Sequence, residues 1–215
     1  MTSNMDISQL SLLTKAAVFA AEKHSRQRRK DKDSTPYINH PLTVGEYLVS
    51  IGKVTDPVVI AAAYLHDTIE DTDTTYEELV EHFGSTVADI VLEVTDDKTA
   101  SKLDRKLTVI EHASSISTAA KQVKIADMLH NMSSILTAPP TSWSPDQIRG
   151  YFVWAYKVYL KLRDCNESLA KYMDKFFAEA TVQIDGTEYS IVPTDEAELD
   201  AVWNRYIHLM TVVDN

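Results

Sequence analysis

Apolar residues recur at intervals of three and four positions along most of the chain, as in amphipathic helices. The sequence predicts helices over residues 7–24, 40–52, 57–67, 75–84, 86–97, 103–116 and 118–136. Ser144 and Pro145 begin a further long helix that extends to about residue 164, and another follows to about residue 180. Thr74 and Glu77 have the spacing of a capping box, and Gly84 marks a helix end.

The pattern changes after residue 180. The segment "TVQIDGTEYSIV" alternates around Asp185–Gly186, a strong signal for a β-hairpin, and "DEAELDAVWNRYIHLM" predicts a last helix. The predicted organisation is therefore an all-α bundle over residues 1–180 and a hairpin-plus-helix extension over residues 181–215, packed on the same domain. Covering a site, joining subunits and simple extra packing all remain open as roles for this extension.

Composition narrows the class of protein. The formal net charge of -11 argues against general binding to nucleic acid or to a membrane surface. No apolar run approaches the roughly 20 residues of a membrane-spanning helix, and the first ten residues lack the features of a secretion signal. With a single cysteine, Cys165, the expected location is cytoplasmic.

One segment departs from the acidic average. "RQRRKDK" at residues 26–32 holds five cations in seven positions. Two interpretations fit this run: a solvated helix end, or a loop that binds a small, highly charged anion.

The stretch "YLHDTIEDTD" carries four ionisable groups on one turn of chain: His66, Asp67, Glu70 and Asp71. A helix continuing through it would stack His66 on Glu70 and Asp67 on Asp71. Because the preceding residues are almost all apolar, the histidine and the adjacent carboxylate need a neutralising partner. A bound metal ion and a hydrogen-bonded core histidine beside a surface aspartate fit this pair equally well.

Two residues from other predicted helices favour the metal. His40 stands in "TPYINHP", and Asp127 lies on the apolar stripe of "VKIADMLHN", where a lone aspartate is unusual. Two imidazoles and two carboxylates suit Mn²⁺, Fe²⁺ or Zn²⁺ better than Ca²⁺ or Mg²⁺. Such a set leaves coordination positions open for water and substrate, as catalytic sites do.

The order H…HD…D resembles the signature of the HD-domain phosphohydrolases. The segments "RRKDKDSTPYINHP", "AAAYLHDTIEDTDTT", "VTDDKT" and "VKIADMLHNM" resemble RelA/SpoT-type alarmone hydrolases, above all the small single-domain members that include the metazoan SpoT homologue. The resemblance covers about residues 9–165. It departs at Ser34, where the family has glycine, and at Ser133, where many relatives carry arginine.

The resemblance implies an HD-domain helical bundle and a Mn²⁺-dependent hydrolase that removes the 3′-pyrophosphate of (p)ppGpp. It implies one ion, with Fe²⁺ or Zn²⁺ as alternatives to Mn²⁺, held by His40, His66, Asp67 and Asp127. Glu70 and Asp71 match the pair that activates the attacking water, and a carboxylate one turn from the ligands suits Glu70 to the role of base. The substrate contacts implied or expected are Arg29, Lys30, Lys102, Asn131 and Tyr151.

Other functions remain open at this stage. The ligand set does not separate (p)ppGpp from (p)ppApp, NADPH or a nucleoside monophosphate, and a non-catalytic nucleotide-binding module is a further alternative. The presence of the Glu70–Asp71 pair favours an enzyme. The sequence leaves the oligomeric state undecided.

Overall fold

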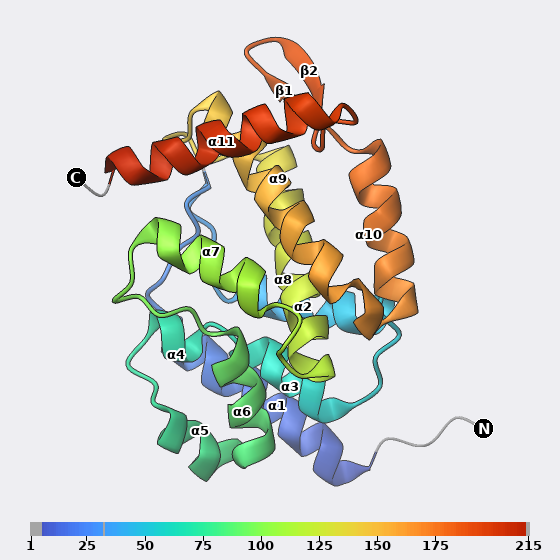
Figure 1. Ribbon diagram of the computed structural model, residues 1–215. Helices are drawn as coiled ribbons and strands as arrows, with labels where there is room; N and C mark the ends of the chain where they lie inside the picture. The colour runs from blue at the N-terminus through green and yellow to red at the C-terminus, as the bar shows by residue number, and fades with distance from the viewer. Residues whose placement is uncertain (1–5, 32, 214–215) are drawn as a thin grey trace.

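The computed structural model describes residues 6–31 and 33–213 (Figure 1). Helices account for most of this part of the chain, which confirms the predicted fold class. The first half contains α1 (Ile7–Lys23), α2 (Asn39–Ser50), α3 (Pro57–Leu65), α4 (Thr68–Asp71), α5 (Tyr76–Phe83), α6 (Ser85–Val94) and α7 (Lys102–His112). The second half contains α8 (Thr118–Thr137), α9 (Pro145–Leu162), the 3₁₀ turn η1 (Arg163–Cys165), α10 (Glu167–Glu179), β1 (Thr181–Ile184), β2 (Thr187–Ser190) and α11 (Glu196–Val213).

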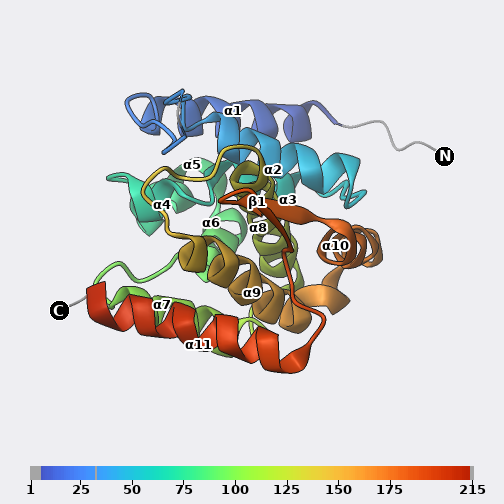
Figure 2. The same ribbon diagram turned by 90° about the horizontal axis from the view of Figure 1, so that it is seen from above.

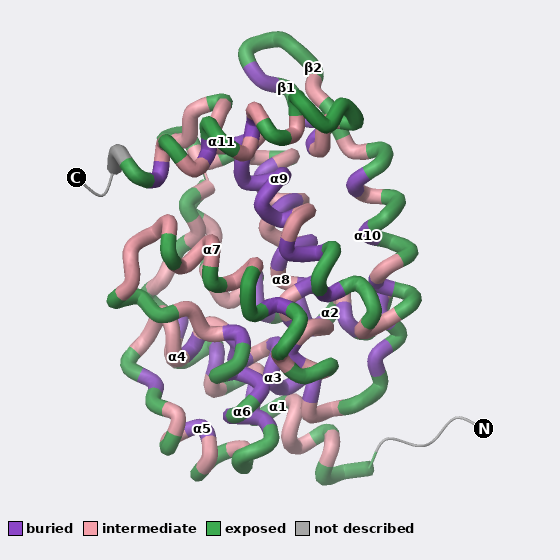
Figure 3. Tube along the Cα trace, in the orientation of Figure 1, coloured by how far each residue is buried: buried purple, intermediate pink, exposed green. Residues whose placement is uncertain are grey.

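Helices α3 and α8 form the centre of the bundle. Helix α3 packs against α1, α2, α6 and α8, and its sequence "PVVIAAAYL" is apolar almost all round, as a helix enclosed by others requires. Seen from above, α1 lies on one side of this centre and α9, α7 and α11 lie on the other (Figure 2). The buried residues gather along α3, α8 and α9 (Figure 3). The core therefore fixes α3, which His66 and Asp67 directly follow, and α8, which carries Asp127.

No continuous helix runs through "YLHDTIEDTD", and the helix predicted over residues 57–67 ends two residues early. Helix α3 ends at Leu65, His66 and Asp67 form a turn, and α4 begins at Thr68. The His66 Nδ1 atom lies 2.8 Å from the carbonyl oxygen of Ala63, and the Thr68 hydroxyl donates to that of Leu65 at 2.7 Å. Side chains that bond these carbonyls compete with the helical hydrogen bonds, so the helix stops where the metal-binding pattern begins.

The predicted capping box at Thr74 and Glu77 is displaced by one residue. Thr75 caps α5, its hydroxyl accepting from the backbone N–H of Glu78 at 3.1 Å. Thr74 is buried instead, and its hydroxyl lies 2.8 Å from that of Thr72. The helix start was therefore predicted correctly, but its cap was not.

The segment after residue 180 forms the expected hairpin and helix. Strands β1 and β2 pair antiparallel around Asp185 and Gly186, whose φ angles of 50° and 79° suit the tight turn of a two-residue hairpin. Helix α11 then returns across the bundle and packs along α9, with further contacts to α7 (Figures 1 and 2). Across the described residues, we find no helix with the length and apolar character needed to span a membrane.

Candidate metal and nucleotide site

Four side chains from three parts of the bundle meet in one buried cluster. His40 comes from the first turn of α2, His66 and Asp67 from the turn after α3, and Asp127 from α8. The candidate ligand atoms of His40, His66 and Asp67 all lie within 4.8 Å of one another. Asp127 joins them through Oδ1, which lies 3.1 Å from Nε2 of His40 and 3.7 Å from Nε2 of His66.

The direction of the His66 ring shows that this cluster fits a cation. Its Nδ1 atom faces the Ala63 carbonyl oxygen, which can only accept, so Nδ1 carries the proton. In the neutral ring, Nε2 then presents a lone pair to Oδ2 of Asp67 at 3.1 Å, and Nε2 is buried without a hydrogen-bond partner. With Oδ1 of Asp127 at 3.7 Å, three acceptor atoms surround one position, and they repel one another unless a positive charge stands between them.

The electrostatics of the cluster agree with this interpretation. Burial lowers the pKa of the His66 imidazole, but Asp67 and Asp127 outweigh it, and the pKa lies well above its ordinary value. Burial raises the pKa values of both carboxyls, yet the histidines pull each of them well below its ordinary range. The cluster therefore stabilises a bound positive charge, either a proton or a metal ion.

A second layer of hydrogen bonds orients the candidate ligands. The Tyr37 hydroxyl donates to Oδ2 of Asp67 at 2.6 Å, and the Asn131 amide donates to Oδ1 of Asp127 at 2.7 Å. Nδ1 of His40 lies 2.7 Å from Nδ1 of His130, whose pKa is lowered to about 4 by burial and by the neighbouring His40 and Arg29. A neutral His130 can accept a hydrogen bond from the Nδ1–H group of His40, which leaves Nε2 of His40 free to bind a cation.

Sequence reasoning missed Tyr37 and His130. Both stand inside the quoted segments "TPYINHP" and "MLHNM", three residues from His40 and from Asp127 respectively. Residues three positions apart on a helix lie close together, so this spacing was the available signal that Tyr37 and His130 contact the candidate ligands.

Glu70 lies beside the cluster in α4 and lines the same cavity of about 190 Å³. Burial, reinforced by the nearby Asp96 carboxylate, raises the pKa of Glu70 to about 7. Its Oε2 atom accepts a hydrogen bond of 3.1 Å from the backbone N–H of Asp96. Glu70 is thus a carboxyl group held in place and poised to exchange a proton near neutral pH.

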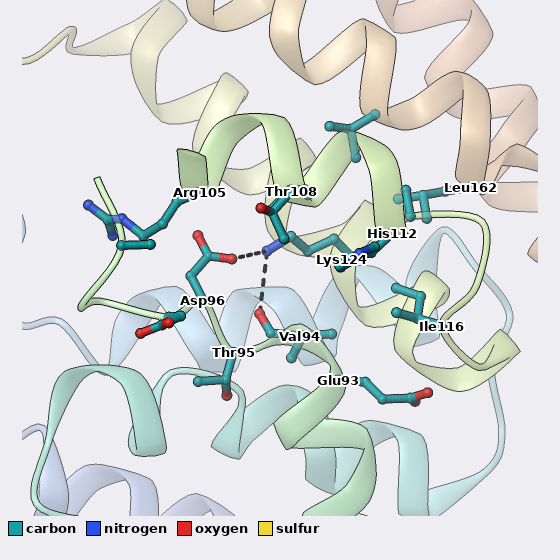
Figure 4. A pocket seen from close by; sticks show the side chains of 15 residues that line it. Glu93, Val94, Thr95, Asp96, Arg105, Thr108, His112, Ile116, Lys124 and Leu162 are labelled. Carbon is teal, nitrogen blue, oxygen red and sulfur yellow. Dashed lines mark hydrogen bonds and ion pairs between the residues drawn. The ribbon is translucent and has the colours of Figure 1, made fainter. Parts of the chain in front are cut away.

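Lys124 of α8 holds the loop that positions Glu70. Its Nζ atom lies 3.7 Å from Oδ1 of Asp96 and 3.4 Å from the carbonyl oxygen of Val94 (Figure 4). Val94, Asp96 and Lys124 line the cavity that contains the His–Asp cluster, hereafter the metal cavity. On their other side they line a separate cavity of about 280 Å³ beneath α7. Lys124 was not a candidate at the sequence level, because its role depends on a contact between residues 28 positions apart.

A larger cavity of about 730 Å³ adjoins the metal cavity. Arg29, Lys30, Trp143 and Tyr151 contribute to its walls. Tyr37, Asp71 and Asn131 line both cavities and form the junction between them. Arg28, Arg29 and Lys30 of the basic run therefore line a binding space, and this part of the run is not merely a solvated helix end.

Hydrogen bonds connect the basic wall to the cluster. Nη2 of Arg29 donates to Oδ1 of Asn131 at 3.1 Å, and Asn131 in turn donates to Asp127. At the junction, the Lys98 ammonium group pairs with Asp71. Two cationic side chains, Arg29 and Lys98, thus contact residues at the junction of the two cavities.

Lys102 does not join the other predicted substrate contacts. It begins α7 and, within the described part of the chain, is absent from the walls of both cavities. One turn further along α7, the Lys106 ammonium lies 5.0 Å from the Tyr151 ring centre and 3.3 Å from that of Trp154. Burial lowers the pKa of Lys106 to about 7. Among the described residues of α7, Lys106 thus reaches the aromatic rings of α9, whereas Lys102 lines neither cavity.

Comparison with known proteins gives consistent matches. The HD domain family model matches residues 16–147. The Xenopus tropicalis guanosine-3′,5′-bis(diphosphate) 3′-pyrophosphohydrolase MESH1 is 48% identical over 82% of this chain and 99% of its own. The human MESH1 is 45% identical over the same shares of the two chains.

A solved structure described as a metazoan orthologue of SpoT that hydrolyses ppGpp superposes with a TM-score of 0.76 and is 39% identical. The match covers 83% of this chain and 98% of that one. About a sixth of the present chain therefore has no counterpart in that structure.

Proposed function

Because the chain belongs to the HD domain family and, within it, to the MESH1 group of guanosine-3′,5′-bis(diphosphate) 3′-pyrophosphohydrolases, we propose that it hydrolyses (p)ppGpp. The reaction adds water across the ester bond between the ribose 3′-oxygen and the pyrophosphoryl group. The products are pyrophosphate and GDP, or GTP when the substrate carries a 5′-triphosphate.

The observation that carries this proposal is the connection of the two cavities through Tyr37, Asp71 and Asn131. The larger cavity has the volume and the basic wall for a charged nucleotide, and the smaller one holds the His–Asp cluster and Glu70. A nucleotide whose reactive phosphate reaches the junction brings that phosphate next to Glu70.

His40, His66, Asp67 and Asp127 are the proposed ligands of one divalent cation. Their mixed imidazole and carboxylate donors suit Mn²⁺, Fe²⁺ or Zn²⁺, and Mn²⁺ is the proposed ion because the family resemblance implies it. When bound, such an ion lowers the pKa of water and polarises a phosphoryl oxygen. Tyr37, Asn131 and His130 keep the ligand atoms directed at it through the hydrogen bonds described above.

Glu70 is the proposed general base. Its ionised form takes a proton from the attacking water as oxygen bonds to the 3′-phosphorus, and the pKa of about 7 keeps a large share of it ionised at neutral pH. The departing ribose 3′-oxygen regains a proton from solvent or from Glu70. Asp71, paired with Lys98, is proposed to orient the water.

Arg29 and Lys30 are the proposed partners of the phosphate groups, and Tyr151 is the proposed wall against the nucleoside. Phosphate binding favours arginine because its planar guanidinium donates two parallel hydrogen bonds. The hydrogen bond of Arg29 to Asn131 orients that guanidinium before substrate arrives.

The test is a product assay with Mn²⁺ on ppGpp, ppApp, NADPH and a nucleoside monophosphate. We expect pyrophosphate and GDP from ppGpp, and no turnover by the Asp67→Ala variant, whose metal content and circular dichroism are measured in parallel. Release of inorganic phosphate from NADPH without pyrophosphate release from ppGpp would replace the alarmone with the dinucleotide. Binding of ppGpp without any product would identify a nucleotide-binding module.

A further inference from the structure

Helix α9 presents two neighbouring residues to different surroundings. Tyr151 lines the nucleotide cavity, whereas the adjacent Gly150, about 100° further round the helix, faces α11. A helix wall of this kind keeps its shape only if its rear face is supported.

The support at Gly150 is the ring of Tyr206 from α11. A Cβ atom built on Gly150 would lie 2.3 Å from two ring carbons of Tyr206, so no larger residue fits while the ring is in place. Tyr206 is 4% exposed and belongs to a buried stripe spaced four residues apart, with Val202 and Met210. The glycine therefore forms a notch in α9 that the Tyr206 ring fills.

Polar contacts on both sides of the notch fix α11 along α9. The Arg149 guanidinium lies 2.5 Å from Oε1 of Glu198, and Nε of Arg205 lies 3.2 Å from Oδ1 of Asp146. The Lys157 ammonium lies 5.3 Å from the centre of the Trp203 ring. These contacts extend from the first turn of α9 to its fourth, past the position of Tyr151.

Helix α7 holds the same part of α9 from another direction. The Trp154 indole donates a 3.0 Å hydrogen bond to the carbonyl oxygen of Lys106, whose ammonium group faces the Tyr151 ring. Helix α9 is thus packed against α7, α8 and α11, and Tyr151 on it contributes to the cavity wall. Among the described residues, none from the extension lines either cavity, so the extension does not cover the site.

We propose that α11 is a positioning element for the nucleotide cavity and that Tyr206, seated against Gly150, is its positioning residue. This inference rests on the proposed function, since the nucleotide it affects is the alarmone. The extension acts through the backbone of α9 on Tyr151 and leaves the metal cluster, on α2, α3 and α8, untouched. It gives residues 181–213 a role in the affinity for nucleotide and not in the chemical step.

The first test compares Tyr206→Ala with the conservative variant Tyr206→Phe. Removing the ring is expected to raise KM for ppGpp about tenfold and to change kcat less than twofold, while the phenylalanine variant keeps both values. The matched control is Leu169→Ala, an equally buried truncation in α10 that contacts Gly52 at the far end of α2. A KM unchanged in Tyr206→Ala, or raised equally in Leu169→Ala, overturns the proposal.

The second test uses the notch itself. Gly150→Ala forces its methyl group against the Tyr206 ring and is expected to raise KM as Tyr206→Ala does, whereas the double variant shows no further increase, because both changes break one contact. If the fold increases in KM of the two single variants multiplied in the double variant, the inference would be contradicted.

Hydrogen exchange of residues 145–155, measured without nucleotide, separates this inference from the proposed function. Faster exchange there in Tyr206→Ala, with unchanged Mn²⁺ binding, supports the role of α11 even if ppGpp is not the substrate. Unchanged exchange overturns it even if ppGpp is hydrolysed.

Discussion

The hydroxyl group of Tyr37 donates a 2.6 Å hydrogen bond to the Asp67 carboxylate oxygen that faces both imidazoles of the cluster. The Tyr37 ring also lies 5.7 Å from the guanidinium carbon of Arg29 and lines both cavities. Burial, followed by the charge of Asp67, raises the pKa of Tyr37, so the hydroxyl stays protonated and remains a donor. Tyr37 thus connects the orientation of a candidate metal ligand to the wall that receives substrate.

Replacing Tyr37 by phenylalanine removes this hydrogen bond and keeps the ring. We expect Mn²⁺ to bind about 10- to 100-fold more weakly, as is typical when a second-layer partner of a metal ligand is lost. Titration calorimetry with Mn²⁺ measures the change. Tyr76→Phe is the matched control, because it removes a 2.7 Å hydrogen bond to another aspartate, Asp89, away from the site. Equal Mn²⁺ affinity in both variants would remove Tyr37 from this role.

Glu70→Gln separates proton transfer from metal binding. The amide oxygen of glutamine can still accept from the Asp96 N–H, but it cannot take a proton from water. We expect kcat to fall about 10²- to 10⁴-fold with an unchanged content of Mn²⁺. Glu77→Gln, in the first turn of α5, is the control for losing one carboxylate nearby. Turnover close to that of the wild type would exclude Glu70 as the base.

The pH dependence of kcat follows from the same residue. Below a pH of about 7, Glu70 is mostly protonated and cannot act as a base, so activity is expected to rise with pH through this value. The charge of Asp96 contributes to this high pKa, so Asp96→Asn should move the rise to lower pH. Metal content is measured at each pH, since protonation of the histidines also releases metal. A profile that is flat between pH 5 and 8 at constant metal content would contradict this prediction.

The sequence predicted most of the helices and the hairpin because their signals are local. Asp185–Gly186 specifies a turn by its own backbone preferences, and the apolar stripes specify buried faces whatever they pack against. Whether a helix continues past His66 stayed open at the sequence level, because the break depends on side chains that bond to carbonyl oxygens of the preceding turn.

The candidate metal ligands could be predicted from the sequence, whereas the residues around them could be predicted only in part. His40, His66, Asp67 and Asp127 stand in recognisable segments, and the structure brings them together. Lys106 and Lys124 carry no such signal, because their contacts join helices distant in sequence. Lys102 shows the reverse problem, since this basic residue stands at a plausible position in the sequence but lines neither cavity in the described part of the chain.

Lys124 provides the last prediction, because it links α8 to the loop that holds Glu70. Burial lowers the pKa of Lys124, but Asp96 and Asp127 outweigh this effect and raise it, so the ammonium group stays charged. Lys124→Met keeps the length of the side chain and leaves the Asp96 carboxylate and the Val94 carbonyl without their partner. The variant is expected to lose about 1–3 kcal/mol of stability.

The same change should also affect catalysis, because the Asp96 N–H that holds Glu70 belongs to the released loop. We expect kcat to fall at least tenfold while the content of Mn²⁺ and KM change little, and Lys124→Arg to recover most of kcat because it restores the charge. Lys121→Met, one turn earlier on α8, controls for the loss of a lysine. Chemical denaturation and steady-state kinetics provide the two measurements. If Lys124→Met lost stability without losing kcat, Lys124 would hold the loop without positioning the base.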